Sequence, residues 1–115
     1  MLANLFGSVS KERVLIYLAG RGRGYAREIA RFYHAPLNPV QNAMEKLEAA
    51  GVLVSRFVGR TREYEFSPRY PVRSELTVLL NRALDLYPSK LRDKLLFTRS
   101  RPRRKGPPGG RDGAF

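Results

Sequence analysis

The sequence contains no cysteine, no tryptophan and a single histidine, His34. Without cysteine, disulfide bonds, thiolate metal sites and cysteine nucleophiles are excluded. One histidine is too few for a histidine-rich metal site, and no serine stands in a recognisable pattern with a base. We therefore expect no metal and no other cofactor, and we do not expect an enzyme.

Long apolar runs are also missing. The longest runs, residues 14–19 and 78–80, fall far short of the roughly 20 residues that a membrane-spanning helix needs. The first nine residues lack the basic start and the long apolar stretch of a signal peptide. The sequence therefore predicts an intracellular, cytoplasmic protein without a membrane partner.

Acidic residues are scarce, since 10 Asp and Glu stand against 22 Lys and Arg in 115 residues, a net charge of +12. An excess of positive charge of this size indicates an anionic partner. Nucleic acid is the first candidate, and an anionic membrane is the second. The length allows one domain, or one small domain with a tail. A hydrophobic fraction of 43% is sufficient for a packed core.

The composition changes at Thr98. Residues 98–115 hold six basic residues and one acidic residue, a net charge of +5, which leaves +7 for residues 1–97. Proline, glycine and arginine dominate this segment, and such a composition cannot bury enough apolar surface to offset the chain entropy of folding. We expect one domain over 1–97 and a disordered basic tail over 98–115, either without a role or in contact with phosphates.

Apolar periodicity and turn residues predict the order of the elements. Ser10 is expected to cap the second helix, a loop is expected through the glycines at 20, 22 and 24, and Asn38 is expected to cap a helix with Gln41 in a capping box. The expected helices cover about 2–6, 10–19, 25–33, 38–50, 73–87 and 90–97, and the expected strands cover 52–58 and 61–66.

This order, with a tight turn before the helix at 38–50 and a hairpin after it, predicts a mainly α fold with a small β-hairpin, a winged helix-turn-helix with N- and C-terminal helices. Three segments carry family-like motifs: R-E-I-A-R at 27–31, V-Q-N-A-M-E-K-L-E-A-A-G-V-L-V at 40–54 and G-R-T-R-E-Y at 59–64. In these segments the sequence resembles the ArsR/MarR-like superfamily of bacterial and archaeal transcriptional regulators. The resemblance implies a DNA-binding regulator associated with the nucleoid of a prokaryotic cell.

The helix at 38–50 carries amide side chains where base reading needs them. A helix fits the major groove of B-DNA, where Asn and Gln bond to adenine and Glu accepts from cytosine. The alternative is an ordinary solvated helix face. The candidate base-reading residues, opposite the apolar face of this helix, are Asn38, Gln41, Asn42 and Glu45.

Basic residues surround this amide face. Arg56, Arg60 and Arg62 flank the hairpin turn, where an arginine can enter a narrow minor groove. The alternative role for Arg56 and Arg62 is to protect an edge strand against aggregation. The candidate contacts to the DNA backbone are Arg27, Arg31 and Lys46.

His34 stands where the superfamily usually has glycine, and a turn residue with positive φ is favoured over a metal ligand. Many relatives carry a capping serine where this chain has Pro36. We therefore expect Asn38 to take over the cap and to shorten the recognition helix by about two residues.

An apolar stripe on the helix at 73–87 allows two interpretations, completion of the monomer core or, with the first helix, a two-fold interface in a homodimer that reads a palindrome. The expected interface residues are Leu2, Leu5, Phe6, Leu76, Leu79, Leu80, Ala83, Leu84 and Tyr87.

The favoured function is a dimeric, sequence-specific regulator of double-stranded DNA, with the helix at 38–50 in the major groove and the wing at 56–62 in the minor groove, acting as a repressor by occlusion. The first alternative is an architectural or RNA-binding protein, for which charge matters more than the amide face. The second is a protein-interaction adaptor with a degenerate winged domain. The operator and any small-molecule effector are not indicated by the sequence.

Overall fold

The structure, a computed structural model, describes residues 1–97, so the expected tail at 98–115 lies outside the described residues. The fold class is confirmed: helices dominate, and a small antiparallel sheet accompanies them. The elements in chain order are α1 (Ala3–Phe6), α2 (Val9–Arg21), β1 (Arg23–Gly24), α3 (Ala26–Tyr33), α4 (Leu37–Ala49), β2 (Leu53–Val58), β3 (Thr61–Phe66), α5 (Arg73–Asp85) and α6 (Ser89–Phe97).

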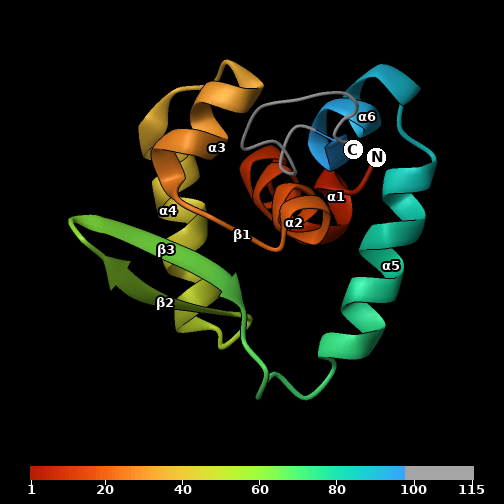
Figure 1. Cartoon of the computed structure of the whole chain (residues 1–115). Coiled ribbons are helices and arrows are strands. Elements are labelled where there is room, and N and C mark those ends of the chain that lie inside the picture. The colour runs from red at the N-terminus through yellow and green to blue at the C-terminus, as the bar shows by residue number, and fades with distance from the viewer. Residues whose placement is uncertain (98–115) are drawn as a thin grey trace.

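Helix α2 lies at the centre of the molecule (Figure 1). Helices α3 and α4 stand on one side of it, with the β2–β3 hairpin projecting from the lower end of α4, and α5 stands on the opposite side. An arginine of α2 secures the last helix, because Arg21 Nε donates to the carbonyl of Leu95 at 2.8 Å. The hairpin and α4 therefore share one side of the molecule, away from α5.

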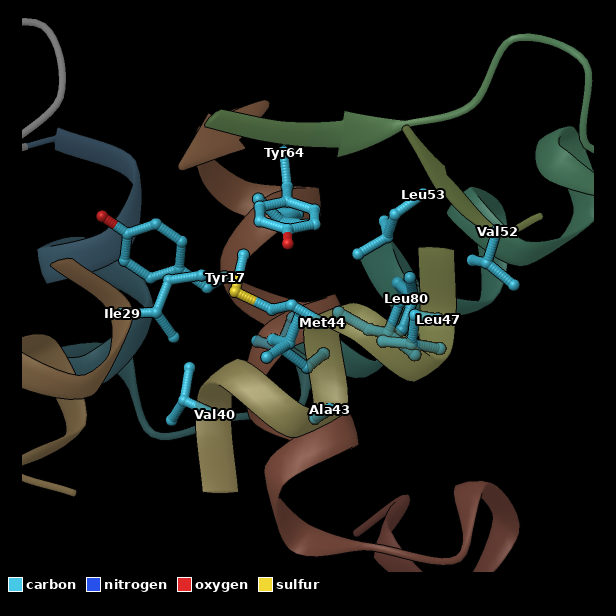
Figure 2. Close-up of a cluster of buried hydrophobic side chains, with 14 of the residues drawn as sticks. Tyr17, Ile29, Val40, Ala43, Met44, Leu47, Val52, Leu53, Tyr64 and Leu80 are labelled. Carbon is cyan, nitrogen blue, oxygen red and sulfur yellow. The ribbon is translucent and has the colours of Figure 1, made fainter. Parts of the chain in front are cut away.

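The core forms where the apolar faces of α2, α3, α4 and α5 meet the base of the hairpin. Met44 of α4 is fully buried and lies among Tyr17, Ile29 and Tyr64 in Figure 2. A buried leucine or methionine contributes about 1.5–3 kcal/mol through the loss of apolar surface from water. This shared core fixes α4 and the base of the hairpin against the same scaffold.

The sheet contains a third strand that sequence analysis missed. Its order is β1-β3-β2, and the two residues of β1, Arg23 and Gly24, pair with Glu65 and Tyr64 of β3. The expectation of a loop from Gly20 to Gly24 was therefore wrong at four residues, since Gly20 and Arg21 belong to α2 and Arg23 and Gly24 form β1. A Cβ at Gly24 would stand 2.9 Å from Tyr17 Cε1, so the strand lies against α2 where only glycine fits.

Two helix starts differ from the expected ones. Ser8, and not Ser10, caps α2, since its Oγ accepts from the Lys11 amide at 3.0 Å. Helix α4 begins at Leu37 after Pro36, so Asn38 is not a cap and the helix is not shortened. Pro39 fits within the first turn because amides there have no carbonyl partner inside the helix.

The turn between α3 and α4 follows the expectation for His34, which has φ of 53°. Its amide donates to the carbonyl of Arg31 at 3.2 Å and closes the end of α3. The left-handed residue reverses the chain within a few positions, and α4 packs against α3 as in a helix-turn-helix.

The buried carboxylate of Glu12 joins the N-terminal segment to the end of α5. The amide of Leu2 donates to its Oε2 at 3.1 Å, and the hydroxyl of Tyr87 donates to the same oxygen. Burial opposes ionisation, but these bonds and the nearby Met1 ammonium outweigh it and lower the pKa of Glu12. The ionised form of Glu12 therefore stabilises the packing of these segments.

Four residues expected in a dimer interface belong instead to the core of the single chain, which corrects that assignment for them. A side chain buried in this way cannot contact a second copy unless the core opens. The four residues are Leu2, Leu80, Ala83 and Leu84. Among the other five, Phe6, Leu76 and Tyr87 are half-buried, while Leu5 and Leu79 are 66% and 40% exposed.

Candidate nucleic-acid interface

The outward face of α4 is polar and open to solvent. The helix buries Val40, Ala43, Met44 and Leu47, and the 3.6-residue period turns the opposite side outward. All four candidate base-reading residues are exposed: Asn38, Gln41, Asn42 and Glu45. This face therefore presents amide and carboxylate groups that no apolar surface covers.

A groove separates α4 from the wing, which is the β2–β3 hairpin. It has a volume of about 630 Å³ and reaches from the start of α3 to the tip of the hairpin. Candidate residues from three elements meet in this groove, namely Arg27, Gln41, Glu45, Arg60 and Arg62. Asn38 and Asn42 do not line it and lie further round the exposed face of α4.

The remaining backbone candidates also lie on the surface. Arg27 and Arg31 are exposed on α3, and Lys46 is exposed on α4. Arg27 lines the groove, whereas Arg31 and Lys46 do not. The structure thus places one of these three cations in the groove and the other two outside it.

The three candidate arginines of the wing have different surroundings. Arg60 follows Gly59, which has φ of 64° in the turn of the hairpin. Its side chain is exposed at the mouth of the groove and has no ion pair within residues 1–97. Arg60 is therefore the wing arginine with the most freedom to bind an external anion.

Arg56 lies on the other face of the hairpin. It is paired in register with Glu63, and its Nη2 lies 3.5 Å from Glu63 Oε1. Arg23 of β1 approaches the same carboxylate oxygen at 3.7 Å. Glu63 therefore lies between two guanidinium groups on the sheet face that points away from α4, and Arg56 is not part of the groove.

Arg62 faces α4 and is bound to it. Its Nη2 lies 3.0 Å from Glu48 Oε1, and its Nε donates to Ser55 Oγ at 2.8 Å. The Ser55 hydroxyl in turn donates to Glu48 Oε2 at 2.6 Å. These three polar groups, which we call the wing clamp, join the two strands of the wing to the last turns of α4.

Sequence reasoning missed Glu48, Ser55 and Phe57 as site residues. Phe57 is 70% exposed on the groove side of β2, with the Arg62 guanidinium 5.8 Å from its ring centre. Strand alternation was the available signal, because Ser55, Phe57 and the buried Leu53 share one face of β2. Nothing in the sequence indicated the contacts with Glu48, because Ser55 and Arg62 are 7 and 14 positions away and the three residues belong to three different elements.

Two further features bear on the kind of site. Within residues 1–97, no group of three or more His, Asp or Glu side chains is placed to hold a metal ion. In the same part of the chain, no helix combines the length and apolar character that crossing a membrane requires.

Comparisons with known proteins bear on the fold. A solved structure of adhesin competence repressor (AdcR) from Streptococcus pyogenes matches with a TM-score of 0.50 and 19% sequence identity, over 82% of this chain and 86% of that chain. No protein-family model matches the chain, and no curated protein matches it. The helix-turn-helix, the hairpin and this likeness together show that the chain has the winged helix-turn-helix fold.

Proposed function

We propose that the chain is a sequence-specific, double-stranded DNA-binding transcriptional regulator. Helix α4 lies in the major groove in this proposal, and Arg60 at the tip of the wing enters the adjacent minor groove. The groove between α4 and the wing then receives the sugar–phosphate strand that separates the two DNA grooves. Arg27, which lines the groove, binds its phosphates, with Arg31 and Lys46 on the flanks.

One observation carries the proposal: exposed amide side chains on α4 lie beside a groove lined by arginines. Phosphate binding alone needs only cations, whereas Gln41 and Asn42 add donors and acceptors that match the edge of adenine. Non-specific binding to phosphates would not require amide side chains at the start of one helix. This arrangement favours sequence reading over architectural or RNA binding.

The test is selection of bound fragments from a random duplex library, followed by affinity measurements on the selected sequence. We expect a motif, and we expect Asn42→Ala to cost about 1–3 kcal/mol of discrimination at its base pair. Lys46→Ala, the matched phosphate variant, should weaken binding to all duplexes equally. Equal affinity of the wild-type chain for selected and random duplexes would refute the proposal.

The proposal includes a homodimer, because a single winged domain reads about one half-site. Helix α5 supplies a seam that differs from the predicted one. Val72, Leu79 and Leu86 stand seven residues apart along α5 and its two ends, and they are 48%, 40% and 57% exposed. Seven-residue spacing is typical of a helix that packs along a partner helix.

An antiparallel pairing of two α5 helices about Leu79 is self-complementary. It sets Val72 against the partner's Leu86, and it brings Glu75 beside the partner's Arg82 on the same flank of the seam. The two expected ion pairs favour this pairing over a parallel one. Because α5 lies on the side of the molecule opposite the wing, a seam there leaves both copies of α4 open (Figure 1). A dimer on an operator would block other proteins from the same DNA, which is the basis for proposing a repressor.

A further inference from the structure

The distal half of the wing has little apolar support. At the base of the hairpin, Leu53 and Tyr64 are buried in the core. Beyond the Ser55–Tyr64 pair, the side chains of both strands and the turn are exposed or half-buried. The position of Arg60 relative to α4 therefore depends on other contacts.

The wing clamp is the contact that reaches this distal half. Arg62 lies two residues after Arg60 and opposite Phe57, yet its guanidinium reaches back to Glu48 in α4. Ser55 connects the two charged residues, because its hydroxyl donates to Glu48 and accepts from Arg62 Nε. The guanidinium also lies 5.6 Å from the ring centre of Tyr64, which anchors it above the core.

We propose that Arg62 is a positioning residue that sets the distance between the wing tip and α4, and that it does not contact DNA. The inference rests on the proposed function for its link to DNA binding. The Nε and Nη2 groups of this guanidinium are engaged by a hydroxyl and a carboxylate, and two rings lie beside it, so these contacts fix its position against α4. In this proposal the clamp holds Arg60 at the distance from α4 that lets the helix and the wing tip enter adjacent major and minor grooves.

Glu48→Gln separates this role from direct contact by the sign of its effect. If Arg62 bound phosphate, the variant would free Arg62 and remove a negative charge near DNA, so binding would tighten. The clamp predicts weaker binding, by about fivefold, the largest factor that a solvent-exposed ion pair of about 1 kcal/mol supplies. Arg62→Gln should weaken binding by a similar factor, and the double variant should lose no more than either single one.

The salt dependence provides a second readout. Loss of a phosphate contact lowers the slope of log affinity against log salt by about 0.9, so Arg62→Gln should keep the wild-type slope. Glu63→Gln is the matched control, because it removes the same charge from the opposite face of the hairpin. It should leave affinity unchanged or slightly tighter. Tighter binding by Glu48→Gln, or a reduced slope in Arg62→Gln, would overturn the inference.

The positioning role can also be tested without DNA. Since the chain has no cysteine, spin labels at Val58→Cys and Ala49→Cys report the distance between the wing tip and the end of α4. We expect a narrow distance distribution that broadens or shifts with Glu48→Gln and with Arg62→Gln, but not with Glu63→Gln. An unchanged distribution in both clamp variants would refute the inference, whereas lack of DNA binding by the wild-type chain would refute only the proposed function.

Discussion

The removal of the Arg60 charge should change the salt dependence of DNA binding by the amount that one phosphate contact contributes. Arg60 is exposed, lines the groove and has no ion pair within residues 1–97, so in the minor groove its charge is available to the phosphates on either side. In Arg60→Gln, the slope of log affinity against log salt should fall in magnitude by about 0.9. Between 50 and 200 mM salt, the affinity of this variant should drop about 3.5-fold less than that of the wild type.

Fluorescence anisotropy with one labelled duplex at several salt concentrations measures both slopes. Arg56→Gln is the control, because Arg56 is paired with Glu63 on the far face of the hairpin and should leave the slope near the wild-type value. A full slope in Arg60→Gln would show that the Arg60 charge does not meet a phosphate. An equal drop in the slope of Arg56→Gln would show that the different surroundings of the two arginines do not affect DNA binding.

Three further predictions concern the dimer, the acid stability and the packing of the sheet. Leu79→Glu should sediment as a monomer where the wild type is a dimer, while Asn81→Glu, at an exposed position on the side of α5 away from the seam, should not; equal behaviour of the two would refute the α5 seam. Because the pKa of Glu12 is lowered from 4.5, its carboxylate stabilises the fold above that pH and loses this effect as the pH falls. Urea denaturation should therefore show a smaller loss of stability from pH 7 to pH 3 in Glu12→Gln than in the wild type. Gly24→Ala should cost about 1–3 kcal/mol in the same assay, because the added Cβ would stand 2.9 Å from Tyr17.

The local order of elements was predictable because periodicity and turn residues act over short distances. The apolar spacing of α4 and α5 and the alternation in β3 are properties of neighbouring residues, and these elements appear where the sequence indicates them. His34 at positive φ was predictable for the same reason. The start of α4 was not, because two prolines and an asparagine offered competing starts and the structure selected Pro36.

The strand β1 illustrates a decision made at long range. Its two residues lie in a run of glycine and arginine that has no strand pattern of its own. They become a strand because Tyr64 and Glu65, some 40 positions further along the chain, offer an open edge. Edge pairing of this kind depends on where the hairpin packs, which no local signal encodes.

The sequence by itself determined the winged helix-turn-helix order, the exposed amides of α4 and the excess of positive charge around them. Only the tertiary structure decided what each arginine of the wing does. Arg56, Arg60 and Arg62 look alike in the sequence, yet one is paired on the outer sheet face, one is exposed at the tip and one is bound to Glu48. The physical reason is that strand pleating alternates the faces and the turn exposes its own residues. The carboxylates that pair with Arg56 and Arg62 come from other elements of the fold, β3 and α4.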